Sequence, residues 1–317
     1  MKLDLKDKKI LYQLDINAKQ SSNKIAKNVG LSKDAVNYRI NKLVKEEIIK
    51  RFYTVLNTPQ LGYMHFNTLF RFRNINTSIK EEFSKYCLNH KKIIWCVYCY
   101  GSWDFGVSFL ARDLNEYHVF IQEILNKFGD NIHEKTVSLV VDSPTYTRDH
   151  LINSKTSKEF QYKTSTKTTI DETEHMILSL ISQNAQLNVV EIAQKLNLTQ
   201  DIVRYRINQL VKNNIIQGFR ISLNIEELGY FYYKLLFTLK DITPKKEIEF
   251  KEYCKRNPNI IQFIKYIGKW EIQLELEVTS EKELFKIIEE IRNRFGDIIQ
   301  TYEILRLKEE KLDYYPI

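Results

Sequence analysis

Residues 25–43 read IAKNVGLSKDAVNYRINKL, and this stretch decides the fold of the first part of the chain. Gly30 can adopt a positive φ in a tight turn, and Ser32 can cap a helix that follows it. On both sides of the turn, apolar residues recur at helical spacing: Ile25, Ala26, Val29, Val36, Ile40 and Leu43. The spacing therefore predicts two short helices joined by a turn, which is the helix-turn-helix arrangement.

The flanking residues extend this unit in both directions. Leu5, Ile10, Leu11 and Leu14 lie on one stripe of a preceding helix, and residues 48–55 alternate in the manner of a strand. We therefore expect residues 1–60 to form a winged helix-turn-helix domain, with a strand or wing after its last helix.

The same pattern occurs twice in the chain. Tyr38-Arg39-Ile40-Asn41 recurs as Tyr205-Arg206-Ile207-Asn208, and the offset of 205 − 38 = 167 also carries Leu61-Gly62-Tyr63 onto Leu228-Gly229-Tyr230. The chain is thus a tandem duplication of a unit of about 150 residues. Residues 147–169, between the copies, are rich in Ser, Thr and Lys, which predicts a solvated linker.

The second part of each unit has the order β-α-β-β-α-β, which is typical of a ferredoxin-like α+β domain. Its second strand, residues 93–100, is apolar on both sides in the first copy, so we expect the sheet to pair with the sheet of the other copy as a pseudo-dimer. The predicted domains are residues 1–60, 61–146, 170–227 and 228–317, alternately winged helix-turn-helix and ferredoxin-like, with the linker at 147–169.

The outward face of residues 33–45 is the predicted DNA-binding surface, since the last helix of a helix-turn-helix lies in the major groove. Asn suits the adenine edge, and Lys suits phosphate or guanine. The predicted contacts are Ser32, Lys33, Asn37, Tyr38, Arg39, Asn41, Lys42 and Lys45, and in the second copy Gln200, Arg204, Tyr205, Arg206 and Asn208.

The two copies differ in charge. Residues 1–60 hold 13 Lys and Arg against 6 Asp and Glu, a net charge of +7, whereas residues 168–227 hold 5 against 7, a net charge of −2. Because phosphate neutralisation dominates the affinity of proteins for DNA, we expect the first copy to bind DNA more strongly. The net charge of the whole chain, +8, also favours an anionic partner.

Other functional classes find little support in the composition. We expect no disulfide among the four cysteines, no metal site at Cys96 and Cys99, which lie on opposite faces of a strand, and no catalytic use of the six histidines. The chain has neither an apolar stretch of membrane-spanning length nor an apolar signal core. The expectation is a cytoplasmic protein that is not an enzyme and has no cofactor.

These motifs resemble the leucine-responsive/asparagine-operon (Lrp/AsnC) transcription regulators. The resemblance rests on Leu3-Asp4, Asp7 and Ile10-Leu11, on the Gly30-Leu31-Ser32 turn, on Val36, Arg39-Ile40 and Leu43, and on Ile48-Ile49. It occurs twice and covers nearly the whole chain. It implies a sequence-specific regulator that binds double-stranded DNA and assembles into homo-oligomers. Glu46-Glu47 stands where the family usually has a glycine before the wing.

Two further segments resemble the Gly-x-x-Asp hairpin of that family's regulatory (RAM-type) domain, where members bind amino acids or other small effectors between paired sheets. The resemblance implies that the residues of both hairpins contact an effector such as an amino acid. The alternative is a tight hairpin with a packed tryptophan. The eight residues are Gly101, Ser102, Trp103, Asp104, Gly268, Lys269, Trp270 and Glu271.

Two other functions remain open at this stage. Siroheme decarboxylases are similar to this family and also combine two units, but the strand where their His-Asn-Tyr motif is expected reads Cys96-Val97-Tyr98-Cys99-Tyr100, without a histidine. The second alternative is an effector-binding scaffold that does not bind DNA, which the acidic second copy favours.

Overall fold

The computed structural model describes residues 3–154, 158–161 and 168–312. The predicted order of elements is confirmed in the first copy, where three helices and a strand precede the β-α-β-β-α-β unit. The elements are α1 (Leu5–Ile16), α2 (Ser22–Val29), α3 (Lys33–Lys45), β1 (Ile49–Leu56), β2 (Met64–Phe72), α4 (Thr77–Asn89), β3 (Ile93–Tyr100), β4 (Phe105–Ala111), α5 (Leu114–Phe128) and β5 (Ile132–Asp142).

The second copy repeats this order. Its elements are α6 (Glu172–Gln183), α7 (Val189–Leu196), α8 (Gln200–Lys212), β8 (Ile216–Leu223), β9 (Phe231–Leu239), α9 (Pro244–Arg256), β10 (Ile260–Ile267), β11 (Ile272–Val278), α10 (Glu281–Phe295) and β12 (Ile299–Leu312). A capping box opens the first helix of each copy, from Asp4 and Asp7 in α1 and from Asp171 and Glu174 in α6.

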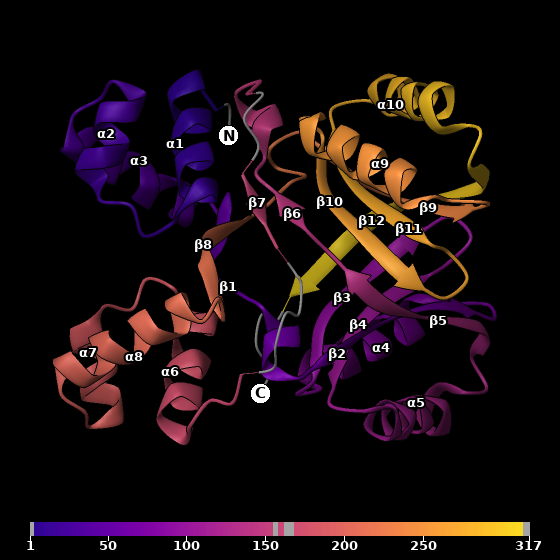
Figure 1. The fold of residues 1–317 in the computed structure, drawn as a ribbon, viewed down its shortest axis with the longest axis horizontal. Helices are drawn as coiled ribbons and strands as arrows, with labels where there is room; N and C mark the ends of the chain where they lie inside the picture. The colour runs from indigo at the N-terminus through magenta and orange to yellow at the C-terminus, as the bar shows by residue number, and fades with distance from the viewer. Residues whose placement is uncertain (1–2, 155–157, 162–167, 313–317) are drawn as a thin grey trace.

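The strands of the two ferredoxin-like halves close into one antiparallel barrel. The strand order is β11-β9-β12-β3-β4-β2-β5-β10, and β10 pairs back with β11. The copies meet at two seams, β12 with β3 and β5 with β10. We expected the two sheets to pack face to face. In the structure they also join edge to edge at both seams, so neither sheet has an unpaired edge strand in the barrel. Helices α4, α5, α9 and α10 cover the outside of the barrel (Figure 1).

The strands that follow the two helix-turn-helix units pair with each other. In this two-stranded ribbon β1 runs antiparallel to β8, with Phe52 opposite Ile221 (Figure 1). Each strand also reaches the first helix of the other copy, since the Thr54 hydroxyl donates to the Ile181 carbonyl at 2.6 Å and Ala18 N donates to the Phe219 carbonyl at 2.8 Å. The strand or wing that we predicted after the last helix is therefore one strand of a two-stranded ribbon. Each strand of this ribbon contacts the other copy, so the ribbon joins the two DNA-binding units.

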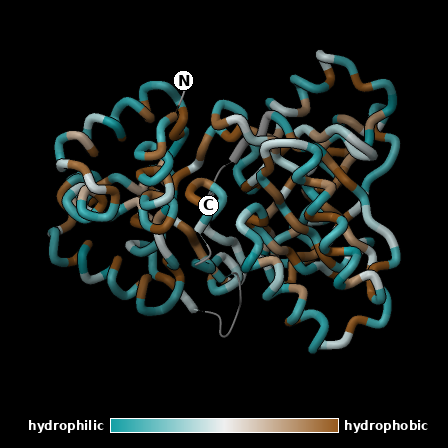
Figure 2. Tube along the Cα trace, turned by 90° about the horizontal axis from the view of Figure 1, so that it is seen from above, coloured by the Kyte–Doolittle hydropathy of each residue, from teal (hydrophilic) through white to brown (hydrophobic). Residues whose placement is uncertain are grey.

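The described residues of the segment between the copies are packed against the protein, contrary to the solvated linker that we expected. The segment contains a short helical turn, η2 (Asp149–Leu151), and strand β7 (Glu159–Phe160), which pairs with β6 (Thr145–Tyr146) just before the segment. Leu151 and Phe160 are buried, so the described part of this segment contributes to the core. Residues 155–157 and 162–167 of the predicted linker lie outside the described residues. From above, the helix-turn-helix pair and the barrel form two lobes (Figure 2).

Candidate functional site

Helix α3 presents most of the predicted DNA contacts to solvent. The Ser32 hydroxyl caps the helix by accepting from Ala35 N at 3.2 Å, and α2 ends at Gly30 with φ +68°. Val36 and Leu43 are buried on the inner side. The opposite side therefore carries an exposed, largely cationic set: Lys33, Tyr38, Asn41, Lys42 and Lys45.

Two of the predicted contacts also bind other parts of the first unit. The Ser22 hydroxyl donates to Asn37 Oδ1 at 2.6 Å, which links α2 to α3. Arg39 donates to Asp4 at 2.8 Å and to Asp7 at 2.7 Å. A backbone hydrogen bond from Asp7 and the bond from Arg39 hold the pKa of Asp4 below its ordinary value. Arg39 therefore ties α3 to the start of α1.

In the second copy, Gln200, Tyr205 and Asn208 are exposed on α8. Arg206 repeats the arrangement of Arg39, since its guanidinium lies 2.6 Å from Asp171. Arg204 lies 2.9 Å from Asp201 on the same helix. Each of these arginines thus faces a neighbouring carboxylate, so α8 offers DNA a weaker positive surface than α3.

The two predicted effector hairpins meet inside the barrel, although they are 167 residues apart in sequence. Trp103 and Trp270 are buried, with ring centroids 5.8 Å apart in an edge-to-face arrangement. Both indole nitrogens donate to Glu303, each at 3.2 Å. The hairpins therefore form a single cluster, which also includes bonds to Glu303 from Ser102 at 2.6 Å and from Lys269 at 3.2 Å.

The remaining hairpin residues have backbone roles. Asp104 accepts from Phe72 N at 2.7 Å and Glu271 accepts from Leu239 N at 2.8 Å, so the Asp-to-Glu difference preserves the contact. A Cβ on Gly101 would lie 2.9 Å from the Ile304 carbonyl oxygen, and one on Gly268 would lie 2.5 Å from the Ser138 hydroxyl. Each hairpin glycine thus allows close approach to a strand of the other copy.

Glu303 was missed by sequence reasoning. Burial would raise its pKa, but hydrogen bonds from Ser102, Lys269 and Trp103 outweigh burial and hold the pKa below its ordinary value. The equivalent residue in the first copy is Thr136, because 303 − 167 = 136. A comparison of the copies position by position would have marked Glu303 as a charge without a counterpart.

A buried charge network, also missed, connects both helix-turn-helix units, the segment between the copies and the second-copy half of the barrel. Asp15 in α1 accepts from Arg220 in β8 at 2.8 Å and from Arg148 in the linker at 2.9 Å. Arg148 also donates to Glu277 in β11 at 3.0 Å, and His150 Nε2 lies 2.6 Å from the same carboxylate. Burial would raise the pKa of Asp15, but Arg220 and Arg148 outweigh burial and lower it.

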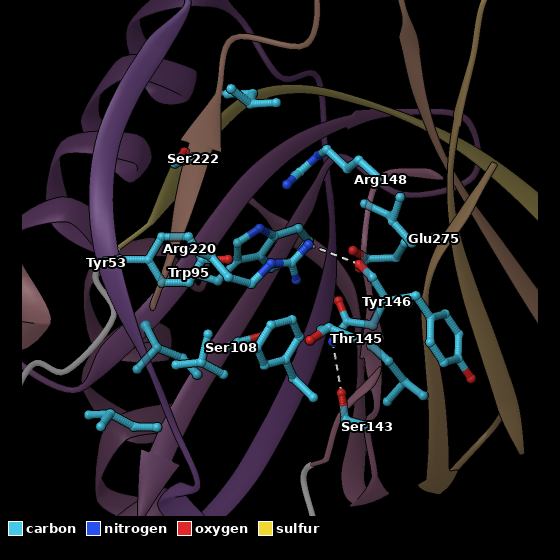
Figure 3. Close-up of a pocket in the computed structure, with 18 of the residues that line it drawn as sticks. Tyr53, Trp95, Ser108, Ser143, Thr145, Tyr146, Arg148, Arg220, Ser222 and Glu275 are labelled. Atoms are coloured by element: carbon cyan, nitrogen blue, oxygen red, sulfur yellow. Dashed lines mark hydrogen bonds between the residues drawn. The ribbon is translucent and has the colours of Figure 1, made fainter. Parts of the chain in front are cut away.

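Beside this network, a cavity of about 250 Å³ lies between the ribbon and one end of the barrel. Figure 3 shows Tyr53 and Ser222 of the ribbon on one side, and Trp95, Ser108 and Glu275 of the barrel among the other walls. Lys234, inside the barrel, lies 3.6 Å from Glu275 and 4.4 Å from the centre of the Trp95 ring. Burial and nearby Lys234 lower the pKa of His65, another wall residue, to about 3, so its imidazole is neutral.

Comparison with known proteins agrees with this geometry. The winged helix-turn-helix DNA-binding family model matches residues 3–50 and 170–217. The transcriptional regulator LrpA of Pyrococcus horikoshii is 36% identical over 86 residues, which cover 27% of this chain and 60% of LrpA. The transcriptional regulator AzlB of Bacillus subtilis is 31% identical over 126 residues, which cover 39% of this chain and 79% of AzlB.

The chain belongs to the Lrp/AsnC family of transcription regulators. This Lrp/AsnC-family chain also shares its whole fold with a solved structure, the siroheme decarboxylase NirDL. The two are 13% identical, with a TM-score of 0.66, over 98% of this chain and 94% of NirDL. At this identity the likeness shows the fold alone, including the arrangement of two units in one chain.

The two cysteines of β3 in this Lrp/AsnC-family chain lie on opposite faces of the strand, as predicted. Cys96 packs under the helices and Cys99 packs inside the barrel. Burial raises the pKa of Cys99 to about 12. Within residues 3–154, 158–161 and 168–312, no group of three or more His, Cys, Asp or Glu could hold a metal ion. No helix in those same ranges is both long and apolar enough to cross a bilayer.

Proposed function

We propose that this chain is a sequence-specific DNA-binding transcription regulator of the cytoplasm whose first helix-turn-helix makes the principal contacts with double-stranded DNA. The observation that carries the proposal is the exposed cationic face of α3, formed by Lys33, Lys42 and Lys45. These side chains supply the phosphate contacts, which dominate affinity. Exposed Asn41 and Tyr38 lie on the same helix and are the proposed base-edge contacts.

The experiment compares two triple variants in DNA retardation across a salt series. Replacing Lys33, Lys42 and Lys45 by alanine removes three cations from α3, whereas alanine at the equivalent Gln200, Gln209 and Lys212 removes only one from α8. We expect the α3 variant to bind all duplexes more weakly and to reduce the salt slope by about 0.9 for each phosphate that is no longer neutralised. Unchanged DNA binding by the α3 variant would contradict the assignment.

We also propose that a small effector such as an amino acid modulates DNA binding. An effector can do so only by binding more tightly to one placement of the helix-turn-helix pair than to another. The hairpin residues remain predicted effector contacts in this proposal. Four of these side chains already contact Glu303, so an effector at the hairpins would have to displace those contacts. The four are Ser102, Trp103, Lys269 and Trp270.

The assembly follows from the duplication. Because one chain already contains both halves of the barrel, it corresponds to a dimer of single-unit relatives. We propose that these pseudo-dimers associate further into homo-oligomers. Size-exclusion chromatography with light scattering tests this proposal, and a mass of one chain, 37.9 kDa, would contradict it.

A siroheme decarboxylase is the second candidate, because the NirDL fold covers nearly the whole chain. We favour a regulator without catalytic activity, since β3 carries no histidine at the expected motif. The cavity, at about 250 Å³, is also below the roughly 300–1,000 Å³ of typical sites for drug-sized ligands. A visible absorption band that forms with this protein on mixing with siroheme would favour the enzyme.

A further inference from the structure

The cavity beside the buried charge network is built from every part of the molecule. Its walls include Tyr53 and Ser222 from the β1–β8 ribbon, Trp95 and Ser108 from the barrel, and Arg148 from the segment between the copies (Figure 3). A molecule bound here would touch the DNA-binding pair and the barrel at once. Its position differs from that of the hairpin cluster, whose tryptophans are absent from these walls.

The walls combine apolar surface with charges that cancel. Arg148 and Arg220 provide two positive charges, and Glu275 and Glu277 provide two negative charges. Both arginines already donate to carboxylates, to Asp15 and, from Arg148, to Glu277. A ligand with net charge would add an uncompensated charge to a buried site, which is costly. The apolar walls are Val55, Leu56, Ile94, Phe160, Ile221, Leu223, Ile225, Ile261 and Ile264.

Small hydroxyl groups stand among these apolar walls and can orient a ligand. Ser108 lies on β4 and Ser222 on β8, so serines line the cavity from the barrel and from the ribbon (Figure 3). Ser143 and Thr145, which lie just before the segment between the copies, also line the cavity, and the Ser143 hydroxyl accepts from Gln262 at 2.8 Å. A few polar groups in a mostly apolar pocket are the usual means of fixing the orientation of a bound small molecule.

We propose that this cavity binds a small molecule with an aromatic or branched apolar body, a hydrogen-bonding head and no net charge, and that its binding changes the affinity of the chain for DNA. The second half of the proposal rests on the proposed function, whereas the binding site itself does not. An apolar cavity of about 150 Å³ holds benzene, so about 250 Å³ is enough for a benzene ring with one substituent.

Three probes with the same ring test the chemistry of the site: benzyl alcohol, benzoate and benzylammonium. Saturation-transfer NMR on the full chain measures the binding of each probe. We expect benzyl alcohol to bind at least about tenfold more tightly than either ion, because each ion would add an uncompensated charge to the buried site. A factor of ten corresponds to about 1.4 kcal/mol of binding free energy. No binding of benzyl alcohol, or equal binding of all three probes, would overturn the proposal.

Two cavity-filling variants test the location from opposite walls. Ser108→Phe fills the cavity from the barrel and Ser222→Phe from the ribbon, while Ser78→Phe on the exposed start of α4 is the matched control. Circular dichroism melts identify which variants are folded. We expect a folded filled variant to lose benzyl alcohol binding at least tenfold and the control to keep it. Unchanged binding in a folded filled variant would overturn the site.

DNA retardation with and without benzyl alcohol then separates the two halves of the proposal. We expect the probe to shift the DNA affinity of the wild-type chain and of Ser78→Phe, but not that of a folded filled variant. Probe binding without any shift in DNA affinity would overturn the regulatory half alone. If the chain bound no DNA but still bound the probe, the proposed function would fail while the site remained.

Discussion

At the scale of single residues, the two copies have equivalent helices but differ in the charged residues that these helices bury. Asp15 is fully buried in α1 between Arg220 and Arg148, whereas the equivalent residue of α6 is Ser182, whose hydroxyl donates to the Ser179 carbonyl at 3.0 Å. A buried carboxylate is stable only with its cations, and removing it leaves those cations without compensation. At this position only the first copy therefore contributes a buried carboxylate to the charge network.

We expect Asp15→Ala to lower the free energy of unfolding by about 3–5 kcal/mol, since it breaks a buried ion pair. The matched variant Ser182→Ala removes a single hydroxyl and should cost about 1 kcal/mol. Urea denaturation followed by circular dichroism measures both. Equal losses for the two variants would show that the buried network contributes no more than an ordinary hydrogen bond.

Backbone conformation is also shared between the copies where residue types differ. Glu47, of the Glu46-Glu47 pair that stands where the family usually has a glycine, has φ +55°, and the equivalent Asn214 has φ +57°. The left-handed turn before the ribbon is thus present without glycine. A glutamate in this region is strained, whereas asparagine tolerates it more readily.

At the scale of elements, the turn between the second and third helices shows the same equivalence. It is formed by Gly30 with φ +68° in the first copy and by Asn197 with φ +53° in the second. A Cβ on Gly30 would meet only the flexible end of Lys6, at 3.2 Å. The backbone angle, rather than lack of space, therefore restricts this position.

We expect Gly30→Ala to lower the stability of the first unit by about 1–2 kcal/mol, which is the cost of the left-handed conformation for an ordinary residue. Gly30→Asn should cost less, because asparagine already occupies the equivalent turn at Asn197. Thermal unfolding of the two variants measures the difference. A Gly30→Asn variant as unstable as Gly30→Ala would contradict this explanation.

At the scale of the whole molecule, the network around Asp15 joins the DNA-binding pair, the linker and the barrel. Burial would raise the pKa of Asp15, but the guanidinium groups of Arg220 and Arg148 outweigh burial and lower it. Burial would likewise raise the pKa of Glu277, but Arg148 and His150 outweigh burial and lower it. A carboxyl whose pKa is lower in the folded state stabilises the fold above its unfolded pKa. That stability is lost as the pH falls through the folded value.

The expected result is a melting temperature that drops as the pH falls below about 4. The difference between the wild type and Asp15→Asn should be largest at neutral pH. It should shrink below the ordinary pKa of aspartate, 3.8, because the unfolded wild-type chain binds a proton there and the folded protein does so only at lower pH. Calorimetry across this range measures it. A difference that stays constant down to about pH 3 would argue against an ionised Asp15 in the folded state.

Local sequence pattern was sufficient for the duplicated α+β order, the helix-turn-helix stripes, the cap at Ser32 and the exposed lysines of α3, because periodicity and turn chemistry act over a few residues. Contacts between distant residues determined three other features: the pairing of β1 with β8, the closure of the barrel, and the contact of both hairpins with Glu303. The same holds for Asp15 and the cavity. These features depend on pairings between residues as many as 312 − 95 = 217 positions apart, such as Trp95 of β3 with Leu312 of β12, for which neither copy alone carries a periodic signal.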